Sequence, residues 1–160
     1  MPYALLYIAN VVLVNWAFAY APVYVLPGGG VWPPVSLLVG FTFVIRDYAQ
    51  RKIGHLVLPA MLLGGIISWY MATPEIAAAS MAAFLSSELI DWGLYTFSGK
   101  PFYKRILLSS AVSTPIDSLI FLGLIDMFSP LTFLSMTISK MVSAFIIYSI
   151  ARRREEGPLC

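Results

Sequence analysis

The chain has 160 residues, of which 59% are apolar and 11% charged, and its mean hydropathy is +0.83. A soluble domain carries about 25% charged residues, so this chain has too few polar residues to cover a surface in water. The formal net charge is only +2, which gives no reason to expect nucleic-acid binding. The composition therefore predicts an integral membrane protein whose partners include the lipid bilayer, built as a single membrane domain over residues 1–160.

Six apolar segments, separated by proline, glycine or charged residues, predict an all-α membrane protein with a bundle of six transmembrane helices. They cover approximately residues 3–21, 35–49, 56–72, 76–97, 106–127 and 131–151. The first and the last three are long enough to cross the ~30 Å hydrocarbon layer at ~1.5 Å per residue. Ala19–Ala21 resembles a signal-peptide cleavage site, but no basic residue precedes the apolar run, so we interpret this segment as the first membrane helix.

The second segment is short, because Arg46 follows Pro34 by only 12 residues, or about 18 Å of helix. Either the loop 28–34 enters the membrane, or Arg46 and Asp47 lie below the headgroups. Non-helical backbone is tolerated at membrane depth only where protein buries it or where it lines a cavity. Both alternatives predict polar groups inside the bundle.

The basic residues lie in alternate loops. Nine of the ten lie near the ends of the second, fourth and sixth segments or in the loops that follow them: Arg46, Arg51, Lys52, Lys100, Lys104, Arg105, Arg152, Arg153 and Arg154. The tenth, Lys140, lies within the last segment. By the positive-inside rule, this distribution predicts that both termini are cytoplasmic in a multi-pass protein of the cytoplasmic (cell inner) membrane.

Away from their ends, the last three apolar segments contain four charged residues: Glu88, Asp91, Asp117 and Lys140. Each costs about 2.5–3.5 kcal/mol near the centre of a membrane helix, so partners are expected. Counted from the segment ends, Glu88, Asp117 and Lys140 fall at a similar depth, and Asp91 lies one turn from Glu88 on the same helix face. The excess of carboxylates must be offset by protons, Arg46, water, or a ligand that is cationic or donates hydrogen bonds.

The surrounding side chains favour a ligand. A carboxylate beside aromatic rings suits a flat heterocycle with N–H donors, which stacks on the rings and bonds the acid. The predicted substrate-binding residues are Phe84, Glu88, Asp91, Trp92, Ser113, Asp117 and Lys140. The predicted gate or supporting residues are Arg46, Asp47, Gln50 and Ser110. Two alternatives remain open: Trp92 as an anchor at the bilayer interface, and an ion-pair cluster that only fixes helix packing.

No enzyme motif is present. The glycines at 28–30 lead into prolines and not into a helix, so they are not a phosphate-binding loop. One histidine and one cysteine cannot form a zinc site, and no nucleophile–base pair is visible. We therefore expect neither enzymatic activity, nor a cofactor, nor a metal site.

Several short motifs are similar to those of one transporter family. They are Phe41–Arg51, Ser87–Trp92, Arg105, Ser109–Ser110 and Ile116–Ser118. With them the chain resembles the vitamin-uptake-like transporter family, of the type that carries queuosine precursors. The resemblance covers the second to fifth segments well, the sixth less specifically, and the first barely.

The resemblance implies a carrier that imports a small heterocycle, such as a 7-deazaguanine or a vitamin-like compound. The N1–H and exocyclic amine of a deazaguanine would pair with Glu88 or Asp91. Protons are a possible co-substrate through Asp91 or Asp117, and a homo-oligomer is possible. The alternatives are a substrate-binding subunit of an energy-coupling-factor importer, which needs a separate ATPase, and a structural membrane subunit whose buried ion-pair cluster only fixes helix packing.

Overall fold

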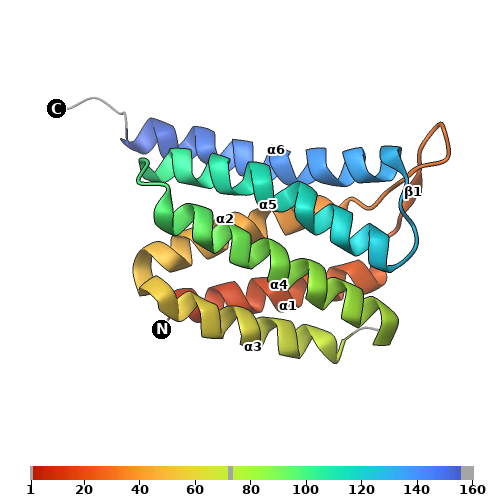
Figure 1. Ribbon diagram of the computed structural model, residues 1–160, viewed down its shortest axis with the longest axis horizontal. Coiled ribbons are helices and arrows are strands. Elements are labelled where there is room, and N and C mark those ends of the chain that lie inside the picture. Colours follow the sequence, from red (N-terminus) through yellow and green to blue (C-terminus); the bar gives the residue numbers. More distant parts are fainter. Residues whose placement is uncertain (1, 72–73, 156–160) are drawn as a thin grey trace.

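The computed structural model describes residues 2–71 and 74–155, which form a helical bundle with one short hairpin (Figure 1). The α-helices are α1 (Pro2–Tyr20), α2 (Val35–Ile53), α3 (Val57–Trp69), α4 (Pro74–Phe97), α5 (Phe102–Leu124) and α6 (Pro130–Glu155). A 3₁₀ turn, η1 (Gly54–Leu56), joins α2 to α3, and strands β1 (Tyr24–Val25) and β2 (Val31–Trp32) form the hairpin. The prediction of a helical protein is confirmed.

The hairpin is the feature that the all-α prediction did not include. Strands β1 and β2 pair antiparallel, and Gly28 in the turn has a φ of +104°, a conformation that favours glycine. The hairpin is attached to α6, because the Val31 amide donates to Thr132 Oγ1 at 2.9 Å. Trp32 Nε1 likewise donates to Ser139 Oγ at 2.8 Å. The loop between the first two helices therefore forms an ordered cover over the start of α6.

The helices run side by side along the long axis of the molecule (Figure 1). Helix α4 packs against α5, α2 against α6, α5 against α6, and α1 against α2 and α3. The chain reverses at Gly54, whose φ is +59°, so α2 and α3 are two separate helices (Figure 1). Helix α1 begins and α6 ends at the same end of the bundle (Figure 1). The end of α2, with Arg51 and Lys52, and the connection from α4 to α5, with Lys100, Lys104 and Arg105, lie at this end too (Figure 1). We call this end the basic end.

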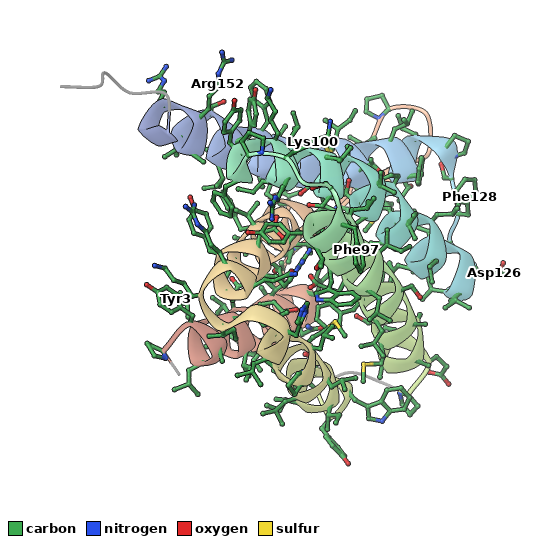
Figure 2. All side chains as sticks on the ribbon, turned by 60° about the vertical axis from the view of Figure 1, so that its left-hand side comes forward. Tyr3, Phe97, Lys100, Asp126, Phe128 and Arg152 are labelled. Carbon is green, nitrogen blue, oxygen red and sulfur yellow. The ribbon has the colours of Figure 1, made fainter. Side chains whose placement is uncertain are left out.

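Figure 2 shows the two ends of the bundle. Tyr3 and Arg152 lie on one side, and Asp126 and Phe128, in the connection between α5 and α6, lie on the other. Three stretches of the described chain are long and apolar enough to cross a membrane: Val35–Trp69, Phe102–Leu124 and Pro130–Arg153. Large apolar side chains are exposed on the outer faces of the bundle, among them Leu62, Ile66, Leu119, Ile138 and Phe145. Such a surface suits lipid, as the composition predicted.

The predicted helix ends differ most from the observed ones at α2, α5 and α6, where α6 continues to Glu155, four residues beyond its predicted end. Helix α2 continues to Ile53, four residues beyond its predicted end, and α5 begins at Phe102, four residues before its predicted start. Helix α3 ends at Trp69, and its predicted end at residue 72 lies outside the described residues. The charged part of α2 stays helical because Arg46 and Asp47 are buried among partners inside the bundle. Of the two alternatives for this segment, the structure shows these charges within the protein interior.

Two apolar clusters form the core and leave a polar layer between them. One contains Val44, Tyr95, Phe102, Tyr103, Ile106, Ala144 and Ala151. The other contains Tyr7, Val11, Ala49, Val57, Ala60 and Met61. The Arg46 guanidinium lies 5.9 Å from the Tyr95 ring of the first cluster. It also contacts Glu88, which accepts a hydrogen bond from Tyr7 of the second cluster. The buried charges of the protein therefore lie in the centre of the bundle.

Candidate functional site

Four charged side chains form a group that we call the arginine cluster: Arg46 and Asp47 of α2, and Glu88 and Asp91 of α4. The Arg46 Nη2 lies 3.0 Å from Asp47 Oδ1 and also pairs with Asp91 Oδ2, and Arg46 Nε lies 3.3 Å from Glu88 Oε2. All four side chains are exposed by 1% or less. One guanidinium thus serves three carboxylates, which is possible because its five N–H donors form a planar fork.

Two further residues complete the surroundings of the arginine cluster. The Tyr7 hydroxyl of α1 donates to Glu88 Oε2 at 2.9 Å. Gln50 Oε1 accepts a bond of 2.5 Å from Arg46 Nη1, and Gln50 Nε2 donates to Thr96 Oγ1 at 2.8 Å. The cluster therefore ties α1, α2 and α4 together through buried polar contacts.

One face of α5 connects the arginine cluster with a second charged group. Ser109 Oγ contacts Asp47 Oδ2 at 3.5 Å, and Ser113 Oγ donates to Asp91 Oδ1 at 3.4 Å. Asp117 is the next residue in this row, because positions four apart lie on the same face of a helix. The three positions run from the arginine cluster away from the basic end.

Asp117 and Lys140 form the second charged group, which we call the lysine pair. Lys140 Nζ of α6 donates to Asp117 Oδ2 at 2.5 Å and to Ser118 Oγ at 2.7 Å. Ser87 Oγ of α4 donates to the other oxygen, Asp117 Oδ1, at 3.2 Å. Lys140 is 1% exposed, whereas Asp117 is 13% exposed. The pair is neutral overall, and its carboxylate is the more accessible half.

The position of Lys140 depends on a close approach of α2 to α6. Gly40 of α2 lies against the Lys140 backbone, and a Cβ at this position would meet the Lys140 carbonyl oxygen and, at 2.7 Å, Ser143 Cβ. Ser143 Oγ also donates to the Leu37 carbonyl at 2.6 Å. A residue without a side chain at position 40 therefore allows the two helices to meet at the level of the lysine pair.

A cavity of about 460 Å³ lies beside the lysine pair. Asp117 and Lys140 line it together with Phe84 of α4, Phe121 of α5 and Asn15 of α1. Residues from the end of α5, the start of α4 and the β2 strand also contribute, so the cavity occupies the half of the bundle away from the basic end. Its volume falls in the range of about 300–1,000 Å³ that is typical of small-molecule sites.

The structure divides the predicted substrate-binding residues into two sets. Phe84, Asp117 and Lys140 line the cavity. Glu88 and Asp91 contact Arg46 instead. The predicted meeting of Glu88 with the lysine pair is therefore not observed.

The reason is the rotation of α4. Adjacent helix residues point about 100° apart, so Ser87 contacts Asp117 of α5 while Glu88 points to α1 and α2.

The remaining predicted residues lie around the arginine cluster or beyond it. Asp47 and Gln50 contact Arg46, and Ser113 contacts Asp91, as described above. Trp92 is half-buried, and its Nε1 donates to His55 Nδ1 at 3.3 Å. Ser110 is buried, and its hydroxyl has no hydrogen-bond partner among the described residues. None of these residues lines the cavity.

The sequence analysis missed Tyr7, Asn15, Ser87 and Ser118 as members of these sites. Asn15 carries a detectable signal, since an amide within an apolar segment needs a polar partner. It donates to the Val11 carbonyl at 2.9 Å and accepts from Ser80 at 3.5 Å. Tyr7 carries no such signal, because tyrosines near the start of a membrane helix are usually interfacial anchors.

In the part of the chain that the structure describes, no group of three or more His, Cys, Asp or Glu side chains could hold a metal ion. The three carboxylates of the arginine cluster are directed at Arg46. No curated protein and no solved structure matches this chain. Residues 38–152 match the family described as "Putative vitamin uptake transporter". This match covers α3, α4 and α5 completely and includes both charged groups, and the resemblance inferred from the motifs is confirmed: the chain belongs to the vitamin uptake transporter family.

Proposed function

We propose that this protein imports a small planar heterocycle, such as a 7-deazaguanine, which binds in the cavity against Asp117. The observation that carries the proposal is the position of the lysine pair. The Asp117 carboxyl group, paired with Lys140 and partly exposed, lines a cavity whose other walls are mostly apolar. Sites for small molecules combine such apolar walls with a few placed polar groups.

The chemistry of the cavity suits a neutral ligand with adjacent N–H donors. Asp117 accepts one bond from Lys140 and one from Ser87, and each carboxylate oxygen has a further acceptor site. Two parallel N–H groups, such as N1–H and the exocyclic amine of a deazaguanine, match a carboxylate with two bonds. Phe84 and Phe121 supply aromatic surface for the ring. The neutral charge of the lysine pair provides no net attraction for a strongly charged ligand.

We further propose six membrane crossings with both termini in the cytoplasm. The basic residues at the ends of α2 and α6, and those in and after the turn between α4 and α5, lie at one end of the bundle, which the positive-inside rule assigns to the cytoplasm. The cavity then lies in the outer half of the membrane, and the arginine cluster closes the path on the cytoplasmic side. Import would require the contacts of Arg46 with α4 to separate, so Arg46, Asp47 and Gln50 act as an inner gate.

The proposal is tested in cells that cannot synthesise queuosine precursors. Expression of this protein together with an added 7-deazaguanine precursor should restore the queuosine modification of tRNA. Asp117→Asn should abolish the recovery, whereas Asp126→Asn, the same change at an exposed position, should not. Unmodified tRNA despite good membrane expression of the native protein would contradict the proposed cargo.

The alternative function, in which buried ion pairs only fix helix packing, is supported at the arginine cluster and not at the lysine pair. The four side chains of the arginine cluster are almost completely buried and none of them lines the cavity. This cluster on its own could serve only to join α2 and α4. Retained uptake in an Arg46 variant that still folds would favour that restricted role.

A further inference from the structure

The arginine cluster has a charge imbalance. It contains one guanidinium and three carboxyl groups, so its formal charge is −2 when all four are ionised (1 − 3). A net charge buried in a low-dielectric interior is strongly unfavourable unless a counter-charge or a proton compensates it. The only cation in direct contact with these carboxylates, among the ion pairs of the described residues, is Arg46. The cluster is therefore built to hold protons as well as arginine.

Arg46 contacts Glu88 through Nε, whereas it contacts Asp47 and Asp91 through Nη2. The distance from Arg46 Nε to Glu88 Oε2 is 3.3 Å, against 3.0 Å from Arg46 Nη2 to Asp47 Oδ1. The neighbour of Glu88 in the chain, Ser87, contacts Asp117 at the cavity. Glu88 is thus adjacent in α4 to a residue that contacts the lysine pair, while its own side chain points to α1 and α2.

The titratable and charged groups around Glu88 come from each helix packed near it. They are Tyr7 of α1, Arg46 and Asp47 of α2, Asp91 of α4 itself, Asp117 of α5, and Lys140 of α6, which pairs with Asp117. His55 of η1 bonds Trp92 instead. Three of these groups are carboxylic acids. A negative charge on Glu88, in addition to the charges on these neighbours, is therefore disfavoured.

A separate observation lies on α5 between the two charged groups. The hydroxyls of Ser110 and Thr114 are buried, and neither has a hydrogen-bond partner within the described parts of the chain. Thr114 is one turn from Asp117, and Ser110 is one turn from Ser113, which bonds Asp91. Buried polar groups without partners are rare in proteins. With Ser118, which bonds Lys140, these two residues form a row of hydroxyls on α5, one position away from the row of Ser109, Ser113 and Asp117.

We propose that protons drive transport and that Glu88 is the group that carries the proton. The proposal rests on the proposed function. A proton enters from the cavity past Asp117 and is held on Glu88 while the arginine cluster is closed. When α2 and α4 separate at the basic end, Glu88 meets cytoplasmic water and releases the proton to it. When the two helices close again, Glu88 pairs with Arg46 as a carboxylate. The empty carrier then takes a new proton from the outer side.

The test uses purified full-length protein in liposomes with radiolabelled 7-deazaguanine as the probe. Two assays separate binding and exchange from energy coupling: counterflow exchange without a gradient, and accumulation with the outside more acidic than the inside. The native protein should perform both, and a protonophore should abolish accumulation only. Glu88→Gln should retain counterflow and lose accumulation by 10-fold or more. Glu75→Gln, the same change at an exposed position of the same helix, should retain both.

A second variant tests the role of Glu88 even if Glu88→Gln does not fold. Tyr7→Phe keeps the ring and removes the hydroxyl that bonds the Glu88 carboxylate. Because that bond favours the ionised form, its loss should shift the midpoint of the pH dependence of uptake to higher pH. An unchanged midpoint in this folded variant would overturn the role of Glu88.

The remaining outcomes are decisive as well. Counterflow with no effect of the proton gradient, or with accumulation driven by sodium, overturns proton coupling and leaves the proposed function intact. Accumulation by Glu88→Gln at the native rate overturns the assignment of this residue. Absence of both counterflow and accumulation in the native protein overturns the proposed function and this inference together.

Discussion

The lysine pair can be tested for energetic coupling by a double-mutant cycle. The variants are Lys140→Met, Asp117→Asn and the combination of the two. Each single change leaves one charged partner without its counter-ion inside the bundle. The combined change removes both charges and leaves side chains of similar size, so no unpaired charge remains.

The structure sets the expected magnitudes. Removing one partner of a buried ion pair destabilises a protein by about 3–5 kcal/mol. Lys140→Met should lie near ~3 kcal/mol, because Asp117 is 13% exposed and can be solvated through the cavity. Asp117→Asn should lie near ~5 kcal/mol, because Lys140 is 1% exposed and keeps only the Ser118 hydroxyl as a partner. The double variant should be more stable than the sum of the two single effects predicts, with a coupling of roughly 2 kcal/mol or more.

The assay is the free energy of unfolding in mixed detergent micelles, measured for all four proteins at one pH and one salt concentration. Additive effects within about 0.5 kcal/mol would refute the reasoning, since residues that do not interact behave in this way.

Three further predictions concern packing and the inner gate. Gly40→Ala should destabilise the protein by about 1–3 kcal/mol in detergent unfolding, because its Cβ overlaps α6. The control Gly93→Ala, whose Cβ meets nothing within 4 Å, should be neutral or stabilising by up to about 1 kcal/mol. Equal effects at both positions would contradict the close approach of α2 to α6. Arg46→Met should lower the free energy of unfolding by about 3–5 kcal/mol or more, because three carboxylates lose their cation. Arg46→Lys should lower it less. An Arg46→Met protein as stable as the native protein in a thermal melt would show that the cluster does not depend on arginine. Trp32→Phe should cost about 1 kcal/mol through the lost bond to Ser139, and a thermal melt identical to that of the native protein would show that the hairpin is not held by this contact.

The presence of a polar interior could be predicted from the sequence, but its internal pairing could not. Glu88, Asp117 and Lys140 within apolar segments require partners whatever the fold, so their burial follows from the composition of those segments. Which charge meets which depends on the rotation of each helix about its axis. A difference of one position, or about 100°, directs Ser87 to Asp117 and Glu88 to Arg46. Tertiary packing decides this rotation, and the surrounding apolar residues lack a strong one-sided pattern.

The role of Arg46 was predicted less completely for a related reason. The sequence analysis predicted Arg46 as a gate residue and as one of several groups that could offset the buried carboxylates, but it could not assign which carboxylates it contacts. In the structure α2 continues beyond it, and the guanidinium is buried because α4 supplies two carboxylates and α2 a third. Tyr7 belongs to α1, the segment that the family resemblance covers least. No motif in the sequence therefore connected Tyr7 with this site.

The central claim is that Asp117 in the cavity binds a heterocycle with N–H donors. Isothermal titration of 7-deazaguanine into the purified protein measures this binding without any requirement for transport. The native protein and Asp126→Asn should bind with equal affinity, and Asp117→Asn should bind at least about 10-fold more weakly, since hydrogen bonds to a charged group contribute about 1.5–3 kcal/mol. Equal affinity in Asp117→Asn, in a variant shown to be folded, would contradict the account.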